Sequence, residues 1–584
     1  MRKWVGLILL CLMAVWIVSA LGEDVSSIEM TRRMGNGINL GNTLEACNNG
    51  AQFGNTTDDV SYYETMWGQP VTTKEMVQGM KKAGFDTLRI PVAWMTNATH
   101  LNQGDYTISE AYLDRVQEIV SWALDADMYV IVNDHWDGGW WGMFGSESEE
   151  TRNLAMEAYI GMWTQIAERF QDVGDHLIFE SANEELGDRF DEDSPLYCHD
   201  SLITRLDEQQ RYDLTNRINQ TFVDTIRAVG GRNTDRFLLI AGYSTNVSKT
   251  SNPHFRMPQD TASDKLLISV HCYTPTTYCL AANAAGATPW GTKKDLQDLQ
   301  AELKMMTKFS QQGIGVVIGE YGALPGADGI MKENAVGYHR FFLDLCDAYG
   351  YCPVLWDTSG FYIRKSLAIT DADMAALYDS RRFEREGTAE EVAAAAEKAI
   401  EEQLETAPVS FREDAIELTD DTCVAWIMWN SGDYSLSYSV GDTYTPDSLS
   451  PGIVPTDVLI EGAGRYTVAL DFTGTAAGYS DSVAFSAIGI SNGELIHPGW
   501  AMHIEEVKIN GEAVKLAGRP YTCSDDGRCT RTNLYNAWVT DLPAGARVLY
   551  GPNIGCSATP LDVNLPVMSK VKTIEITFLY EEKK

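Results

Sequence analysis

Eight short apolar runs recur along the first two thirds of the chain, and each is followed by polar residues and a helical pattern. The runs lie at residues 37–42, 87–94, 129–136, 177–184, 237–243, 266–273, 315–322 and 352–360. Segments between them, such as 73–83 and 110–126, place apolar residues at three- and four-residue spacing, which is typical of amphipathic helices. Eight strands alternating with helices predict a (β/α)8 barrel. The alternative, a doubly wound open sheet, usually has fewer strands and a glycine-rich phosphate turn after the first, which this sequence lacks.

The pattern changes after Pro408 to alternating residues separated by turn clusters. Before that point, Thr388-Ala-Glu-Glu391 has the form of a capping box at the start of an Ala- and Glu-rich helix. Beyond it, residues 466–472 and 507–515 alternate, and the latter contains the hairpin signal Asn510-Gly511. Short strands without helices imply a β-sandwich. We therefore predict a barrel domain at residues 27–406 and a β-sandwich domain at residues 409–584.

The first 20 residues have the pattern of a secretory signal peptide. Basic residues at positions 2 and 3 precede an apolar run at 5–18, and Val-Ser-Ala at 18–20 fits cleavage after Ala20. An uncleaved anchor helix is the alternative, but about 20 apolar residues are needed to span a bilayer. We expect a signal peptide at residues 1–20 and a secreted, extracellular protein that has no membrane association after cleavage.

Composition and charge narrow the classes of partner. The 584 residues are 44% hydrophobic and 22% charged, which is ordinary globular usage. A net charge of −37 repels phosphate backbones, so nucleic acid is disfavoured as a partner and a neutral one is compatible. The 15 tryptophans and 26 tyrosines offer flat faces that suit sugar rings. We expect a monomer that binds a neutral, polymeric substrate.

The cysteines indicate disulfides rather than a metal. Ten follow the signal sequence, and Cys523 and Cys529 flank a turn-rich loop and form the best candidate pair, although no pairing follows securely from the spacing. Nowhere does a closely spaced cysteine pair face a second Cys/His pair at ligand spacing, so we expect no zinc site. The sequence predicts no bound metal and no cofactor.

Candidate functional residues stand at the carboxyl ends of the predicted strands, because that rim of a barrel is open while its interior is packed. Glu184 follows the fourth strand and Glu320 the seventh, so the two acids face each other. The other strand ends carry Asn39 to Asn42, Arg89, Asn133 to Trp136, Asn183, His271 to Tyr273, and Trp356 with Asp357. Such a constellation favours acid/base and nucleophilic chemistry on a neutral, hydroxyl-rich substrate.

Cleavage of a glycosidic bond with retention explains why two acids are needed. One protonated carboxyl donates to the leaving oxygen, and one carboxylate attacks the anomeric carbon from about 5–5.5 Å away. Arg89 and the Tyr273 hydroxyl are suited to keeping Glu320 ionised, and we expect Glu184, beside that charge, to keep its proton to higher pH. Asn183 is placed to bind the sugar 2-hydroxyl, and Trp356 to form a stacking floor.

Further tryptophans are candidates for sugar stacking. Trp140 and Trp141 lie in the Gly-rich loop after the third strand, where the alternative is that they anchor the loop in the core. The predicted β-sandwich resembles the polysaccharide-binding modules attached to exported glycanases. Its candidate platforms, for which core packing is again the alternative, are Trp426, Trp429, Trp500 and Trp538.

The strand-end strings resemble those of family five glycoside hydrolases, most of all the bacterial endo-β-1,4-glucanase and xyloglucanase branch. The strings are Gly37-Ile-Asn-Leu-Gly-Asn-Thr-Leu-Glu45, Leu88-Arg-Ile-Pro-Val92, Asn133-Asp-His135, Asn183-Glu184, His271-Cys-Tyr273, Gly319-Glu-Tyr-Gly322 and Leu355-Trp-Asp357. The resemblance spans about residues 27–405. It implies that Glu184 is the acid/base and Glu320 the nucleophile. It implies an active-site set completed by Arg89, His135, Asn183, His271, Tyr273 and Trp356, to which we add Asn42 from the first string.

Two positions depart from the family pattern. The string Asn133-Asp-His135-Trp136 lacks the common second histidine, and Glu185 follows Glu184 where proline is frequent. The resemblance implies a secreted, retaining endo-β-1,4-glucanase that acts on cellulose, xyloglucan or mixed-linkage glucan. The alternatives are a β-mannanase or another β-glycanase with the same mechanism, and a non-catalytic polysaccharide-binding protein.

Overall fold

The computed structural model describes residues 25–47, 57–190, 206–282, 284, 287–326, 329–412, 414–431, 444–447, 449–516, 528–536 and 568–582. These residues belong to two compact units. The first comprises Met1–Cys272, Gln300–Gly322 and Phe342–Ile400. The second comprises Tyr273–Leu299, Ala323–Phe341 and Glu401–Lys584, so it includes two segments from the predicted barrel domain as well as the C-terminal region.

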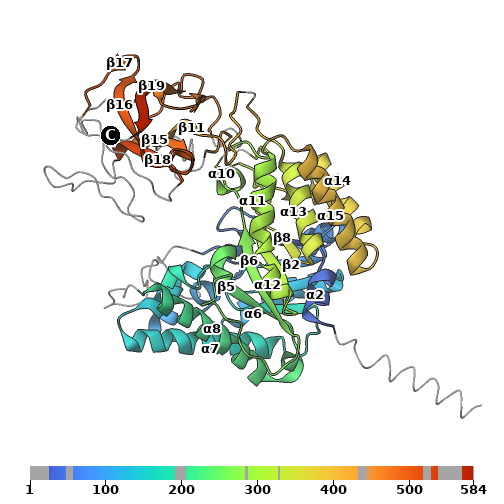
Figure 1. Ribbon diagram of the computed structural model, residues 1–584. Coiled ribbons are helices and arrows are strands. Elements are labelled where there is room, and N and C mark those ends of the chain that lie inside the picture. Colours follow the sequence, from blue (N-terminus) through green and yellow to red (C-terminus); the bar gives the residue numbers. More distant parts are fainter. Residues whose placement is uncertain are drawn as a thin grey trace, which may run out of the picture. The chain divides into compact units, whose positions relative to one another are not determined.

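The first unit contains a closed barrel of eight parallel strands (Figure 1), which confirms the predicted fold class and rules out the open sheet. Strand β1 pairs with both β2 and β8, which closes the barrel. The strands begin at or within one residue of the predicted runs. They are β1 Gly37–Asn39, β2 Thr87–Ile90, β3 Tyr129–Val132, β4 Leu177–Glu180, β5 Leu238–Asn246, β6 Leu266–Cys272, β7 Gly315–Tyr321 and β8 Cys352–Leu355.

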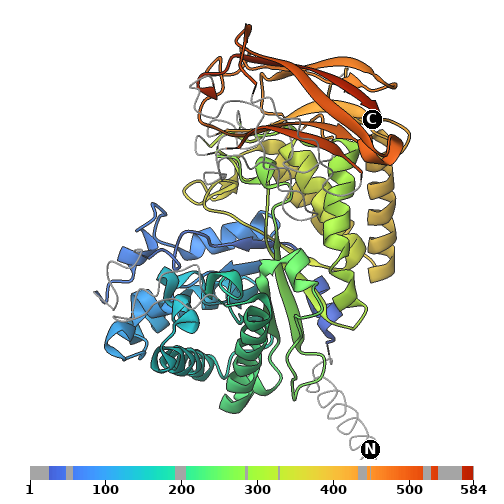
Figure 2. The same cartoon turned by 60° about the vertical axis from the view of Figure 1, so that its left-hand side comes forward.

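Helices alternate with the strands, and Figures 1 and 2 show α6, α7 and α8 outside the barrel. The predicted helix at 73–83 is α4, which the Thr73 side chain caps, and the one at 110–126 is α6. The helices are α2 Ser27–Arg33, α3 Ser61–Glu64, α4 Lys74–Lys82, α5 Trp94–Ala98, α6 Glu110–Asp125, α7 Glu149–Arg169, α8 Glu208–Val229, α9 Val247–Thr250, α10 Thr276–Cys279, α11 Lys293–Lys304, α12 Thr307–Ser310, α13 Ala335–Tyr349, α14 Ala372–Glu384 and α15 Ala389–Thr406.

The predicted capping box begins α15. The Thr388 N–H donates to Glu391 Oε2 at 2.9 Å, and the Glu391 N–H donates to Thr388 Oγ1 at 3.2 Å. Both hydrogen bonds satisfy N–H groups that lack a partner within the helix.

Helix α2 closes the amino-terminal end of the barrel. The Ser27 hydroxyl donates to the Leu266 carbonyl at the start of β6 and accepts from the Gly315 N–H at the start of β7. Met30 and Met34 pack on apolar side chains from the barrel interior, including Ile131. Because this end is covered and the interior is packed, the carboxyl ends of the strands are left to form a site.

The C-terminal part of the second unit is a β-sandwich, as predicted. One sheet has the order β13-β11-β15-β18 and the other β12-β14-β19-β16-β17, and apolar side chains of both form one core. Asn510 and Gly511 both have positive φ in the turn that joins β16 to β17. The strands are β11 Val424–Ser431, β12 Val454–Thr456, β13 Val458–Leu459, β14 Gly464–Asp471, β15 Val483–Ser491, β16 Trp500–Ile509, β17 Glu512–Ala513, β18 Thr530–Asn536 and β19 Thr573–Glu582.

Two of the four tryptophans expected as sugar platforms on the sandwich lie in its core instead. Trp426 and Trp429 are fully buried, and their indole N–H groups donate to the Ser491 and Ser480 hydroxyls at 3.0 Å. Trp426 packs against Tyr444 and Trp429 against Phe472, so neither ring is open to a sugar. Trp500 is half-buried and stacks on His497, whereas Trp538 lies outside the described residues.

Several N-terminal and cysteine predictions also fall outside the described part of the chain. The expected signal peptide lies there, and so does Cys523, so its pairing with Cys529 stays a prediction. Among the residues that the structure describes, no helix combines the length and apolar character needed to cross a bilayer.

Candidate active site

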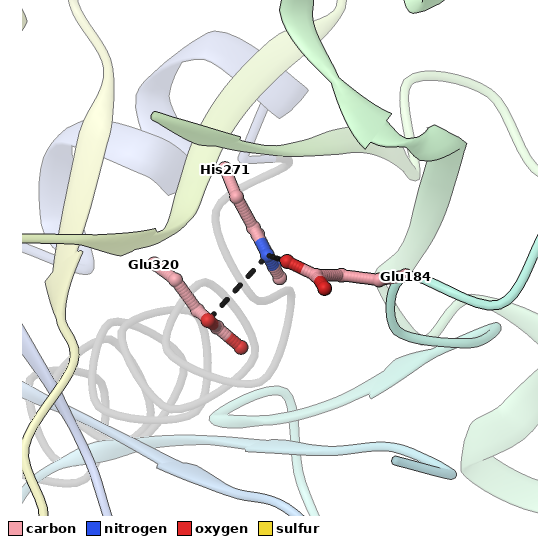
Figure 3. Close-up of side chains that lie close together, drawn as sticks. All are labelled: Glu184, His271 and Glu320. Atoms are coloured by element: carbon pink, nitrogen blue, oxygen red, sulfur yellow. Dashed lines mark hydrogen bonds and ion pairs between the residues drawn. The ribbon is translucent and has the colours of Figure 1, made fainter. Parts of the chain in front are cut away.

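The two acids singled out by the sequence meet at the carboxyl ends of the barrel strands, with a histidine between them (Figure 3). Glu320 lies in β7, His271 in β6, and Glu184 in the loop after β4. His271 Nδ1 is 2.9 Å from Glu184 Oε1 and 3.6 Å from Glu320 Oε2. One ligand-type atom of each of the three residues lies within 4.8 Å of the others, so an oxygen of Glu184 is at most that far from an oxygen of Glu320.

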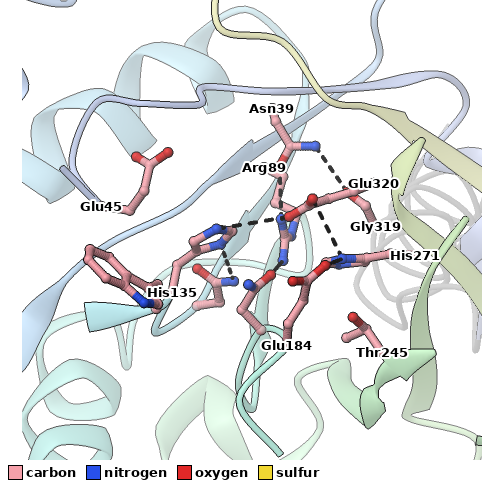
Figure 4. Close-up of polar contacts among 12 residues, drawn as sticks. Asn39, Glu45, Arg89, His135, Glu184, Thr245, His271, Gly319 and Glu320 are labelled. Carbon is pink, nitrogen blue, oxygen red and sulfur yellow. Dashed lines mark hydrogen bonds and ion pairs between the residues drawn. The ribbon is translucent and has the colours of Figure 1, made fainter. Parts of the chain in front are cut away.

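Arg89 holds Glu320 in position through a hydrogen-bonded ion pair (Figure 4). Its fully buried guanidinium donates from Nη1 to Glu320 Oε1 at 3.0 Å and to Asn39 Oδ1 at 2.9 Å. Nη2 donates to Asn183 Oδ1 at 2.9 Å. Burial alone would lower the pKa of Arg89, but the nearby carboxylates of Glu180 and Glu320 outweigh it and raise that pKa. A permanent positive charge therefore faces Glu320 and favours its ionised form.

Glu180 is a site-supporting residue that the sequence analysis missed. It is fully buried in β4, and its carboxylate accepts from Arg89 Nε at 2.7 Å, Asn133 Nδ2 at 3.0 Å and the Ser269 hydroxyl at 2.6 Å. The signal was available, because a charged residue inside an apolar strand needs a buried partner. Glu180 thus balances part of the charge of Arg89 and holds the guanidinium in place.

The structure does not support the expected proton on Glu184. Burial tends to raise the pKa of Glu184, but the hydrogen bond and charge of His271, together with Arg189, outweigh it and lower the pKa. Burial likewise lowers the pKa of His271, but the charges of Glu320 and Glu184 outweigh it and raise that pKa. The sequence-based expectation was wrong because it counted the charge of Glu320 and not the histidine between the two carboxyls. The two shifts together favour a proton on His271 over a proton on Glu184.

Arg189, which the sequence analysis also missed, reaches Glu184 from the same loop. Its Nη2 lies 3.4 Å from Glu184 Oε2, and both side chains are about one third exposed. Glu184 is therefore open to solvent and to a leaving group, whereas the Glu320 side chain is 7% exposed. The two acids therefore differ in access to solvent.

His135 and Trp356 stand on the other side of Glu320. Their rings are stacked, with centroids 5.6 Å apart and planes 11° from parallel. His135 Nε2 lies 3.9 Å from Glu320 Oε1. Burial, followed by the charge of Arg89, holds the pKa of His135 well below its usual range, so this imidazole is neutral. Trp356 is half-buried and presents an aromatic surface at the rim.

The other predicted site residues are placed as follows. Asn183 is buried beside Arg89, and Asn42 is half-buried in the loop after β1, where its N–H donates to the buried Glu45. Tyr273 directly follows β6, is half-buried and belongs to the second unit. Its predicted hydrogen bond to Glu320 stays a prediction.

Trp140 and Trp141 do not offer faces to a sugar. Both are fully buried, and Trp140 Nε1 donates to Asp134 Oδ2 at 3.1 Å. The Trp141 ring packs against Phe144 and Tyr159. The loop segment of residues 137–145 folds into short 3-10 turns that pack on α5 and α7, so these side chains form its core. Their assignment to substrate binding was therefore wrong.

Glu185 holds the loops around the site together. It is fully buried, and its carboxylate accepts the N–H of Trp136 at 2.6 Å and the N–H of Asn183 at 2.9 Å. Burial, only partly opposed by Arg189, raises the pKa of Glu185 to about 7. Because both oxygens accept backbone N–H groups, the departure from the usual proline places a structural carboxyl next to Glu184.

The raised pKa of Glu185 predicts a pH-dependent effect of Glu185→Gln on stability. The folded protein keeps the Glu185 proton up to about pH 7, whereas the unfolded chain releases it near 4.5. The Glu185 proton therefore contributes to the unfolding free energy of wild type, and this contribution is lost as pH rises from 4.5 through about 7. Glutamine does not titrate, so the variant has no such contribution. The unfolding free energy of Glu185→Gln relative to wild type should rise by up to about 3 kcal/mol from pH 4.5 to 8. Urea unfolding at several pH values measures this difference in unfolding free energy. An equal rise for Glu157→Gln, at an exposed position, would show that the raised pKa of Glu185 is not its cause.

A parallel barrel with two carboxylates at its open rim, one held by an arginine and one open to solvent, is the arrangement of a barrel glycoside hydrolase. The model of the cellulase family, glycosyl hydrolase family 5, matches residues 48–361, more than half of the chain. The chain therefore belongs to glycosyl hydrolase family 5.

Known relatives of this chain are endoglucanases. The xyloglucan-specific endo-β-1,4-glucanase of Bacteroides ovatus is 33% identical over 354 residues, which cover 57% of this chain and 65% of that protein. Endoglucanase A of Clostridium longisporum is 35% identical over 336 residues, covering 57% and 60%. The match thus spans less than two thirds of either relative.

Solved structures agree with this family. A family 5 lichenase from Caldicellulosiruptor sp. F32, solved as a mutant with cellotetraose, has a TM-score of 0.52 at 30% identity and covers 61% of this chain and 95% of that one. The Bacteroides ovatus family 5 xyloglucanase in complex with a XXXG heptasaccharide has a TM-score of 0.51 at 30% identity, covering 62% and 77%.

Proposed function

We propose that this protein is a retaining endo-β-1,4-glucanase in which Glu320 is the nucleophile and Glu184 the acid/base. The observation that carries the proposal is the short separation of the two carboxylates, with oxygens within 4.8 Å of each other. Retaining enzymes hold their carboxyl groups about 5–5.5 Å apart, whereas inverting enzymes need about 6.5–9.5 Å to admit a water. The family membership and the endoglucanase names of its relatives support the β-glucan substrate.

In the first step, Glu320 attacks the anomeric carbon while the leaving oxygen takes a proton from Glu184. That proton reaches Glu184 from His271 Nδ1 across 2.9 Å when the sugar displaces water from the site. In the second step, Glu184 accepts a proton from water, which attacks the same carbon and releases Glu320. Glu184 then returns this proton to His271 Nδ1, which restores the starting state. Arg89 stabilises the Glu320 carboxylate before attack and after release.

The proposal extends to where the enzyme acts and on which glucans. The signal-like residues 1–20 support action outside the cell on a plant cell-wall glucan: cellulose, xyloglucan or mixed-linkage glucan. We also propose a polysaccharide as the partner, which the oligosaccharides bound to the related structures support, and we keep the expectation of a monomer. On the β-sandwich, the half-buried Trp500 is the remaining candidate platform among the described residues, so a carbohydrate-binding role for this domain rests on that ring.

Proton NMR of the first products tests the mechanism and the substrate together. With carboxymethyl cellulose, xyloglucan, mixed-linkage glucan and mannan as substrates, we expect rapid cleavage of at least one β-glucan and no preference for mannan. The β-anomer should appear first, because two inversions restore the starting configuration. An initial excess of the α-anomer would overturn the assigned roles. Faster cleavage of mannan would overturn the substrate, and no cleavage at all would leave only polysaccharide binding.

A further inference from the structure

Two partly exposed tryptophans lie side by side next to the proposed catalytic residues. The rings of Trp67 and Trp136 have centroids 5.7 Å apart, with an angle of 43° between their planes. Trp67 is 37% exposed, and Trp136 is half-buried. Burying a large aromatic surface stabilises a protein, so two adjacent rings left partly open at a rim mark a surface that a ligand covers.

The tryptophan pair continues the row of rings that begins at Trp356. Trp136 follows His135 in the chain, and His135 stacks on Trp356. The segment that carries Trp67 is tied to the loop after β8, because Gln69 Nε2 donates to the Thr358 carbonyl at 3.0 Å. The rings therefore come from the connection between β1 and β2, from the end of β3 and from the end of β8, which form one continuous part of the barrel rim.

The position of the acid/base determines which part of a bound glucan lies beside Trp67 and Trp136. The leaving group must lie beside Glu184, whose partners are His271 on β6 and Arg189 after β4. The sugar that becomes attached to Glu320 lies on the opposite side, where His135 and Trp356 stand. The tryptophan pair is on that second side, so it faces the non-reducing part of a bound chain.

Trp136 is held in place by its backbone. It has φ of 53°, in the left-handed region that is rare for a bulky residue. Its N–H donates to Glu185 Oε1 at 2.6 Å, and the other oxygen of that carboxyl accepts the Asn183 N–H. One buried carboxyl therefore sets both the direction of the Trp136 side chain and the turn that carries Glu184.

We propose that Trp67 and Trp136 form a binding site for a β-linked glucosyl unit on the non-reducing side of the cleaved bond, and that Glu185 is the positioning residue for Trp136. This inference rests on the proposed endoglucanase function. Indole rings are apolar and uncharged, which suits the C–H faces of a pyranose ring. The histidine expected at position 136 from the family pattern would offer a smaller and more polar surface.

The test uses aryl β-glycosides with one, two and three glucosyl units, because the aryl group occupies the leaving-group side and every added sugar extends toward the tryptophans. In wild type, kcat/KM for aryl release should rise by about 10-fold or more at the step that fills the tryptophan site. In Trp136→Ala this rise should fall to near 1, whatever the value of kcat/KM for the shortest hydrolysed glycoside. Trp136→Phe should keep part of the rise.

Tyr62→Ala is the matched control, because Tyr62 is an exposed aromatic residue in the same connection and is 46% exposed. It should keep the wild-type rise. If Trp136→Ala keeps the full rise at every step, or Tyr62→Ala loses it equally, the tryptophan site is wrong. If wild type hydrolyses none of these glycosides, the proposed function fails and the inference fails with it.

Glu185→Gln separates positioning from mere packing. Glutamine keeps the size of the side chain but has one acceptor oxygen, so it loses the hydrogen bond to Trp136 or to Asn183. A positioning role predicts that Glu185→Gln loses the rise in kcat/KM with chain length at the same step as Trp136→Ala. Glu185→Asp should show a smaller rise than wild type at that step. A purely structural role predicts equal losses on all three glycosides, which would remove Glu185 from the proposal.

Discussion

Replacing Glu320 by glutamine should lower kcat on β-glucan by about 10⁴-fold or more, equivalent to at least ~5.4 kcal/mol of barrier. The amide oxygen of glutamine has no charge to form the covalent bond to the anomeric carbon. The variant should fold, because that oxygen still accepts the hydrogen bond that Arg89 Nη1 gives to Glu320 at 3.0 Å. Steady-state hydrolysis measures the loss, and calorimetry with cellotetraose should show that the ligand still binds.

A smaller variant at the same position gives a second, independent result. In Glu320→Ala, a small anion such as azide fits where the carboxylate stood and attacks the anomeric carbon directly. The product should be the α-glycosyl azide, because only one inversion takes place. More than about a tenth of wild-type kcat in Glu320→Gln, a threshold of only ~1.4 kcal/mol, would show that the nucleophile is another residue.

The barrel was predictable because every strand begins with an apolar, β-rich run after a turn. The predicted carboxyl ends of the strands were less accurate, because nothing in the sequence separates the last strand residue from the polar loop residues that follow it. The fourth run was expected at 177–184, whereas β4 ends at Glu180. Glu184 therefore stands in a loop, where its side chain reaches both His271 and Arg189.

The meeting of Glu184 and Glu320 at the barrel rim was also predictable from the sequence, but their electrostatics were not. The direction of the Glu184 pKa depends on His271, which is 87 residues away in the chain and 2.9 Å away in space. A strand-end pattern gives the residue types at the rim. It does not give the side chain that lies between two of them.

The tryptophans show the same limit on a larger scale. Trp140 and Trp141 lie in a Gly-rich loop whose composition suggests a solvent-facing segment, yet Tyr159 packs against Trp141 and Phe190 against Phe144 of that loop. Trp136, five residues earlier than Trp141, stays partly exposed and lies beside Trp67 instead. Tertiary packing, rather than local composition, decides which ring is available to a sugar.

Replacing Glu184 by alanine should slow hydrolysis of β-glucan by about 10²–10⁴-fold, the usual contribution of a general acid. The loss should depend on the leaving group. For 2,4-dinitrophenyl β-cellobioside, kcat/KM should stay close to wild type, because this phenolate leaves without a proton and kcat/KM reports the first step. The value of kcat should still fall, since the second step lacks the base that activates water.

Azide then distinguishes Glu184 from every neighbouring acid. Because azide attacks the covalent intermediate without a base, it should restore kcat of Glu184→Ala on the activated substrate and give the β-glycosyl azide, the opposite anomer to that expected from Glu320→Ala. Glu185→Gln is the matched comparison: both Glu185 oxygens accept backbone N–H groups, so its losses should be independent of the leaving group and unaffected by azide. If azide restores kcat of Glu185→Gln, or fails to restore kcat of Glu184→Ala, Glu184 is not the acid/base.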